Sequence, residues 1–199
     1  MPNQFIELLK KRRSIYHLGP TPPLAEAEIS RLIKEAVKYT PSAFNSQSAR
    51  AVILFGQQSK KLWQIVHDTL QKIVPADKFA PTAQKIASFA AGNGTVLFFD
   101  DTNTVKALQE QFPLYQDNFP VWAEQANGMA QLSVWTALAE AGIGASLQHY
   151  NPLIDDEVKK EWQLPQEWKL IAQMPFGSIE APAGDKTFIP IEERVIIKK

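Results

Sequence analysis

A polar loop at residues 40–50 holds the side chains that are best suited, by type and spacing, to bind a ligand. It lies between an amphipathic stretch and the apolar run 51–55, and it carries Ser42, Asn45, Gln47 and one arginine but no acidic residue. Hydroxyl and amide groups beside a single fixed cation suit an anionic or heteroaromatic ligand better than a metal ion. The same composition also fits a capped helix-to-strand connection that binds nothing, and the loop alone does not separate the two interpretations.

A second polar segment, residues 11–16, closes the first expected helix with three cations and a hydroxyl group. Cations at the C-terminal end of a helix complement its dipole, which would explain them without a ligand. Their density beside Ser14 is higher than a dipole requires. We therefore favour an anion-binding role for Arg12 and Ser14, with Arg13 close by.

The two segments, in this order and about thirty residues apart, resemble the signatures of the nitroreductase family of FMN-dependent oxidoreductases. The first signature is Arg12-Arg13-Ser14, and the second is Pro41-Ser42-Ala43-Phe44-Asn45-Ser46-Gln47. The resemblance extends over essentially the whole chain. Within the family the chain looks most like a compact bacterial and fungal subgroup, for which the segments 147–152 and 174–177 are typical.

The hydrophobic pattern sets out the elements that must position these residues. Apolar periodicity predicts helices at about 3–13, 25–38, 59–73 and 121–141, and a short acidic-capped helix at 155–162. Asn3 is expected to cap the first of them. Continuous apolar runs predict buried strands, and these lie at 51–55, 95–99 and 169–174, with a shorter one at 145–149.

The resemblance implies an α+β fold with a central, mostly antiparallel sheet flanked by helices, in a single domain over residues 1–199. It also implies an intertwined homodimer in which the C-terminal arm of each subunit adds to the sheet of the other. The arm would be the segment 189–199, which ends in a β-branched run. Independently, the helix expected at 121–141 mixes small and large residues on several sides, which favours burial in a dimer interface.

FMN needs a cationic grip on its phosphate, hydrogen bonds to its ring edge and an open ring face. By resemblance, the first segment binds the phosphate together with a basic residue near the C-terminus, the loop contacts the flavin from the opposite subunit, and a third segment lines the pyrimidine end. Many relatives carry a second basic residue where this chain has Tyr16, whose hydroxyl can still donate one hydrogen bond. The expected FMN contacts are Arg12, Arg13, Ser14, Tyr16, Ser42, Asn45, Gln47, Leu147, Gln148, His149 and Arg194.

The resemblance implies hydride transfer from NAD(P)H to nitroaromatic or quinone acceptors by a ping-pong mechanism. We expect no catalytic side chain, because the cofactor carries the chemistry. One alternative is another reaction on the same scaffold, such as flavin reduction, reductive dehalogenation or flavin destruction. A second is a flavin-binding regulatory or oxidative-stress-response protein whose reductase activity is incidental.

Composition excludes several other classes of function. The 199 residues include 21 basic and 21 acidic side chains, so no charge excess indicates nucleic acid or a membrane surface. Cysteine is absent and the 3 histidines are scattered, so we expect no metal site. No apolar run approaches the length of a membrane span, and we expect a cytoplasmic protein.

Two groups of residues have structural explanations that compete with functional ones. The pair Asp100-Asp101 ends an expected strand. We interpret Asp101 or Thr102 as the cap of a helix that runs to about Gln111, rather than the pair as an acid–base site. Several aromatic residues could wall a pocket for planar substrates or could simply pack in the interior. These are Phe44, Tyr115, Phe119 and Trp122.

Overall fold

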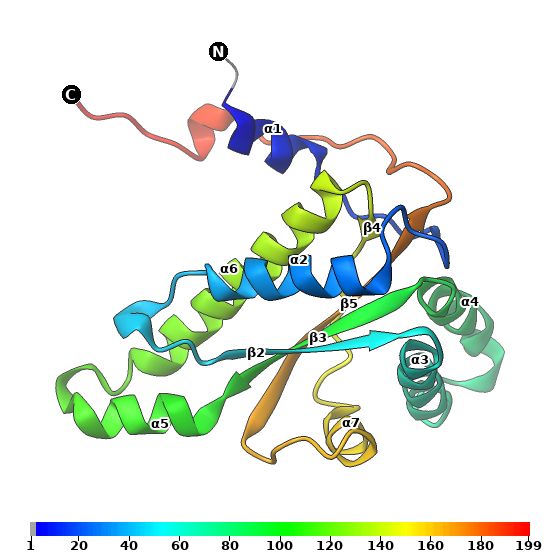
Figure 1. Ribbon diagram of the computed structural model, residues 1–199, viewed down its shortest axis with the longest axis horizontal. Helices are drawn as coiled ribbons and strands as arrows, with labels where there is room; N and C mark the ends of the chain where they lie inside the picture. Colours follow the sequence, from blue (N-terminus) through cyan, green and yellow to red (C-terminus); the bar gives the residue numbers. More distant parts are fainter. Residues whose placement is uncertain (1–2) are drawn as a thin grey trace.

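The computed structural model describes residues 3–199 and builds this part of the chain from helices around a five-stranded sheet (Figure 1). The helices are α1 (Gln4–Lys11), α2 (Glu26–Lys38), α3 (Gly56–Gln71), α4 (Phe79–Ala90), α5 (Thr102–Gln111), α6 (Phe119–Glu140) and α7 (Asp155–Glu161). The strands are β1 (Leu18–Gly19), β2 (Ala49–Phe55), β3 (Gly94–Asp101), β4 (Gly144–Ala145) and β5 (Trp168–Ile179).

All pairings between these strands are antiparallel, in the order β1-β5-β3-β2, with β4 also paired to β5. The expected α+β class with an antiparallel sheet is therefore confirmed. β3 is central because it is apolar on both faces and pairs on both edges. β2 pairs with β3 on one side only, so its outer edge has no strand partner within residues 3–199.

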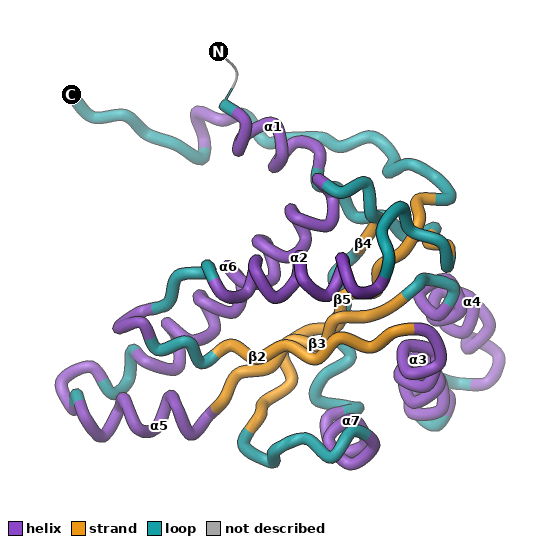
Figure 2. The backbone as a smooth tube through the Cα atoms, viewed as in Figure 1, coloured by secondary structure: helices purple, strands orange, loops and turns teal. Residues whose placement is uncertain are grey.

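The sheet lies between two groups of helices (Figure 2). It separates two apolar layers. Successive side chains of a strand point to opposite faces, so Val96 and Phe98 of β3 enter one layer while Leu97 and Phe99 enter the other. The first layer is covered by α2 and α6, and the second by α3, α4 and α7 (Figure 1). This arrangement fixes α6 against the sheet along its length, where it can position residues at both of its ends.

The long helix α6 keeps part of its apolar surface exposed in this chain. Met129 and Leu132 are each 40% exposed, although Val134 and Leu138 are fully buried. With Phe5 of α1 and Tyr39, they line a groove of about 540 Å³ between α1, α2 and α6. Burial of α6 on most of its circumference, expected from the sequence, would therefore require a second surface over this groove.

Several element ends differ from the sequence-based expectation: α3 begins at Gly56, β5 runs on to Ile179, and β4 covers only Gly144–Ala145 where a strand is expected at 145–149. α1 is capped by the Asn3 side chain as expected, but it ends at Lys11 rather than Arg13, and Arg12 is already extended. The segment after β5 contains no strand; it is an extended arm with one 3₁₀ turn, Ile191–Glu193, and it passes close to α1 in Figure 1. The apolar side chains of this arm, such as Phe188 and Ile197, are 74% and 77% exposed.

Within residues 3–199, no helix is both long and apolar enough to cross a bilayer. The same part of the chain contains no cluster of three metal-binding side chains.

Candidate functional site

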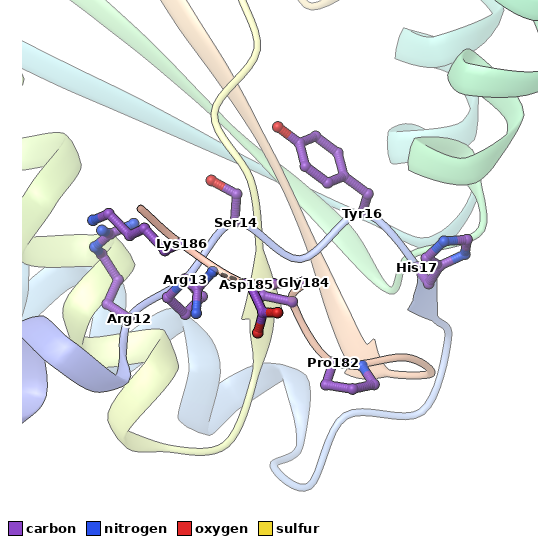
Figure 3. Close-up of a pocket in the computed structure, with 10 residues that line it drawn as sticks. Arg12, Arg13, Ser14, Tyr16, His17, Pro182, Gly184, Asp185 and Lys186 are labelled. Atoms are coloured by element: carbon purple, nitrogen blue, oxygen red, sulfur yellow. Dashed lines mark hydrogen bonds between the residues drawn. The ribbon is translucent and has the colours of Figure 1, made fainter. Parts of the chain in front are cut away.

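The end of α1 and the segment after β5 enclose a cavity of about 440 Å³ (Figure 3). Because α1 stops at Lys11, the following residues run extended beside β4, where the Ile15 N–H donates to the Ala145 carbonyl over 2.9 Å. Lys11 itself donates to the carbonyl of Glu140 at the end of α6 over 3.0 Å. These contacts fix the backbone of the segment 12–16 against the C-terminal end of α6.

Arg12 is held by stacking rather than by an acid. Its guanidinium carbon lies 4.3 Å from the ring centroid of Trp135 on α6. Its Nε is buried without a hydrogen-bond partner, and within residues 3–199 no carboxylate pairs with the side chain. Burial and the neighbouring Arg13 both lower the pKa of Arg12. Because no carboxylate pairs with it, the Arg12 charge is available to an anion, which would offset the burial and the Arg13 repulsion, and the unpartnered Nε is a free donor.

Arg13 also lines the cavity, and its Nη2 donates to the Gly184 carbonyl over 2.5 Å. This bond fastens the segment 182–186 beside the segment 12–17, and it brings Lys186 into the lining. In Figure 3, Arg12 and Lys186 lie at one end of the cavity, and Tyr16 and His17 lie toward the other. Three cations face a single carboxylate, Asp185, so the cavity favours an anion.

Sequence reasoning missed His17 and the whole segment 182–186 of the lining, and Lys186 is the cation among them. It follows the turn Pro182-Ala183-Gly184 as an isolated cation, and nothing in its neighbours distinguishes it from a surface lysine. Arg194, expected in this role, lies after the 3₁₀ turn of the arm, is exposed, and does not line the cavity within this chain.

The third expected segment, residues 147–149, continues from β4 as extended chain, so the backbone N–H and carbonyl groups of successive residues point to opposite sides. The backbone N–H and carbonyl of Gln148 both pair with Gln173 of β5, and its side chain is buried against Ser146. In extended chain the flanking residues face the other way, toward the side where Ala145 binds Ile15. The N–H groups of Leu147 and His149 have no hydrogen-bond partner within residues 3–199, so this edge is open to a ligand.

The loop with Ser42, Asn45 and Gln47 lies elsewhere. Phe44 of this loop stacks on Trp122 near the start of α6, whereas Arg12 stacks on Trp135. The two tryptophans are thirteen residues apart on one helix, which corresponds to roughly 20 Å along its axis. One chain therefore brings the first and third expected segments together and holds the loop well away from them.

The competing structural explanations can now be placed. Asp101 accepts from the N–H groups of Asn103 and Thr104 and so caps α5, as expected. Asp100 is 4% exposed and accepts from Ser48 and Asn127; burial raises its pKa, with these two bonds opposing the effect. The aromatic residues form one cluster around half-exposed Phe44, with ring centroids 4.9–6.0 Å from it, made of Phe112, Tyr115, Phe119 and Trp122.

Comparisons with known proteins identify the family of this chain. The sequence model of the Nitroreductase family matches residues 9–178. The Saccharomyces cerevisiae proteins HBN1 and nitroreductase FRM2 are 37% and 33% identical, each over 187 residues that make up 93% of this chain and 93% of the relative. The structure of nitroreductase CinD from Lactococcus lactis with chloramphenicol is 53% identical with a TM-score of 0.91, covering 98% of this chain and 100% of its own.

A structure from Desulfovibrio desulfuricans in complex with FMN is 18% identical with a TM-score of 0.70, covers 100% of this chain and 99% of its own, and shows the shared fold. The resemblance noted from the two sequence motifs is confirmed by the family match. From that match and from the two yeast relatives, which are more than 30% identical over most of their length, the chain belongs to the nitroreductase family of oxidoreductases.

Proposed function

We propose that this protein is an FMN-dependent oxidoreductase that takes hydride from NAD(P)H and passes it to nitroaromatic or quinone acceptors by a ping-pong mechanism. The observation that carries this proposal is the unpaired charge of Arg12 in a cavity that also holds Ser14 and Lys186. Residues 1–199 would form one domain for this purpose, and the family match spans 9–178.

The donors of the cavity fit a phosphate group. Arg12 offers a planar fork whose Nε is buried without a partner, which suits a phosphate better than a compact ammonium does. Ser14 and Lys186 add a hydroxyl and an ammonium group on the same cavity. Arg13 is committed to the Gly184 carbonyl, so it contributes mainly charge. Tyr16 adds a hydroxyl where many relatives carry a cation.

The open edge at Leu147 and His149 fits the polar edge of the flavin ring. Their two free N–H groups point to the side on which Ala145 binds Ile15, and they can donate to ring oxygens or nitrogens. Gln148 would act indirectly, because its backbone and side chain hold the segment against β5 and Ser146. Hydrogen-bond donors at this position stabilise negative charge on the ring.

The remaining contacts would come from a second copy of the chain. Ser42, Asn45 and Gln47 lie roughly 20 Å along α6 from the cavity, and a homodimer that pairs α6 with its copy would bring each loop to the other subunit's cavity. The groove with Met129 and Leu132 supports such a dimer, because it exposes a contiguous apolar surface.

The C-terminal arm would exchange between the subunits. The open edge of β2 lies beside a groove of about 560 Å³ that holds Lys34, Lys38 and Arg50 together with apolar side chains. The arm has a matching composition: the acidic pair Glu192-Glu193 is followed by the β-branched run 195–197. Opposite charges and an unpaired strand edge together support docking of the partner's arm at this edge, where Arg194 would also reach the site.

The acceptor class is supported by the relatives and by the aromatic cluster. CinD was solved in complexes with chloramphenicol and with 4-nitrophenol, both nitroaromatic compounds. In this chain, Phe44 presents a half-exposed ring directly beside Asn45 of the loop. Planar substrates would stack against it. When bound, FMN supplies the redox chemistry, so no side chain of the protein needs to act as nucleophile or base.

The test is an anaerobic visible spectrum of the purified protein with FMN, recorded before and after NADH and then NADPH. Flavin bands that bleach with a reduced nicotinamide and return with 4-nitrophenol are expected. Flavin bands that remain oxidised with both nicotinamides would contradict the reductase and favour a regulatory flavin-binding role. Absence of flavin bands after addition of FMN would refute the cofactor itself.

A further inference from the structure

The loop proposed to contact the flavin is unusual in its backbone. Phe44, Asn45 and Gln47 have φ angles of 54°, 50° and 48°, in the left-handed region that residues other than glycine rarely adopt. Such conformations persist only where the surrounding structure holds them, and they concentrate at functional sites. The groups that hold this loop therefore control how its side chains are presented.

Gln47 is held on both sides of its backbone. Its N–H donates to the Ser42 hydroxyl over 2.9 Å, and its carbonyl accepts from Nη1 of Arg50 over 2.5 Å. The other nitrogen of the Arg50 fork, Nη2, donates to Oδ2 of Asp101 over 2.7 Å. The planar guanidinium thus joins the end of the loop to a carboxylate through two bonds of fixed relative direction.

Asp101 is itself fixed from several directions. Its Oδ1 accepts from the N–H groups that begin α5, its Oδ2 accepts from the Thr104 hydroxyl, and its own N–H donates to the Ser48 carbonyl. Burial acts to raise the pKa of Asp101, but hydrogen bonds from Thr104 and Asn103 and the charge of Arg50 outweigh it and leave the pKa below its ordinary value. The carboxylate is therefore a charged, rigid anchor at the end of β3.

Residues that follow α5 also contact the loop, at Phe44. The chain that follows α5 supplies Phe112 and Tyr115, whose rings surround Phe44. The same helix thus anchors the Gln47 end of the loop through Asp101 and Arg50, and the Phe44 end through aromatic packing. A change at Arg50 would release one of the two attachments and leave the other in place.

We propose that Arg50, anchored by Asp101, is a positioning residue that holds Gln47 and the loop 42–47 in the conformation that meets the flavin. This inference rests on the proposed function, because it requires FMN to lie against this loop. Arg50 does not touch the reacting atoms; it acts through the carbonyl of Gln47. Its loss would alter flavin affinity and the surroundings of the ring while the fold of the chain remains.

Three variants test this role. Arg50→Lys keeps the charge but loses the fork, so it cannot bond Gln47 and Asp101 together. Asp101→Asn keeps an oxygen that can cap α5 but removes the charge that anchors Arg50. Arg31→Lys is the matched control, since it makes the same exchange at an exposed position on α2.

The measurements are the FMN dissociation constant, the visible circular dichroism of the bound flavin and the thermal unfolding midpoint of each apoprotein. Arg50→Lys and Asp101→Asn are expected to raise the dissociation constant about tenfold, as befits hydrogen bonds to charged groups. Both should also change the flavin circular dichroism, with apoprotein midpoints close to wild type. Arg31→Lys should change neither flavin property.

Each other outcome overturns the inference. Wild-type affinity and circular dichroism in both variants would show that the Arg50 bonds do not position the loop. A loss of affinity that follows an equal loss of apoprotein stability would show a purely structural role. If the wild-type protein binds no FMN, the proposed function fails first and the inference fails with it, so the two failures are distinguishable.

Discussion

Replacing Trp135 by leucine would remove the aromatic face on which Arg12 rests without touching the cavity itself. Trp135 does not line the cavity, and its ring lies 4.3 Å from the guanidinium carbon of Arg12. The stack orders the Arg12 side chain, which pairs with no carboxylate among residues 3–199, so the guanidinium is already in place before the anion binds. We predict that Trp135→Leu weakens FMN binding through the phosphate.

The size of the effect follows from the geometry. Both side chains are partly buried, and a cation–π contact between such groups is worth about 1–2 kcal/mol. Without the stack, Arg12 must be ordered when the phosphate binds, so the free energy of the lost contact is subtracted from FMN binding. At about 1.4 kcal/mol per factor of ten, a loss of about 1–2 kcal/mol should raise the dissociation constant roughly 5- to 30-fold. Trp135→Phe keeps an aromatic face but loses the Nε1 bond to the Ala145 carbonyl at 3.2 Å, so a smaller rise is expected.

The assay is a titration of apoprotein with FMN, followed by flavin fluorescence, with riboflavin as a second ligand. Riboflavin lacks the phosphate, so its affinity should be equal in wild type and Trp135→Leu. Arg12→Met should reproduce the same selective loss, and by a larger factor. An equal loss for FMN and riboflavin would refute the reasoning, because the tryptophan would then support the ring rather than Arg12; unchanged FMN binding would refute it as well.

Two further predictions concern the second phosphate cation and a buried acid. Lys186→Met should raise the FMN dissociation constant more than Arg194→Met does, because Lys186 lines the cavity in its own chain; the reverse order in the same titration would restore Arg194 as the main cation. Burial raises the pKa of Asp100, so the folded state keeps the carboxyl proton at pH values where the unfolded state has lost it. The free energy of unfolding therefore falls as the pH rises from the ordinary pKa of an aspartate to the raised pKa of Asp100. Asp100→Asn should flatten this part of the pH profile in urea unfolding between pH 4 and 8, and parallel profiles for the two proteins would contradict the assignment.

Much of the fold could be predicted from local pattern. The apolar runs 51–55, 95–99 and 169–174 all lie within observed strands, because a strand buried on both faces must be apolar throughout. The side chains of Asn3 and Asp101 cap α1 and α5 as predicted, since capping depends on residues within one turn. The segment 11–16 could also be selected from the sequence, because its charges are contiguous.

The tertiary contacts around the charged segment 11–16 could not be predicted in the same way. Trp135 lies more than a hundred residues after Arg12, and Lys186 lies still further along the chain. The packing of α6 against the sheet places Trp135 against Arg12, and the bond from Arg13 to Gly184 brings Lys186 to the cavity. In the sequence, Arg50 is the single cation of the polar loop, and only the β2–β3 pairing places it beside Asp101, to which it is bound.

The sequence by itself determined which segments we propose to hold an anion and a flavin, because motif spacing and charge density are properties of neighbouring residues. The tertiary structure decided that the cavity and the loop stand roughly 20 Å apart along α6 within one chain. It also decided that Arg12 is stacked instead of ion-paired. These features depend on contacts between residues far apart in sequence, and such contacts are set by the packing of whole helices and strands, which no local pattern encodes.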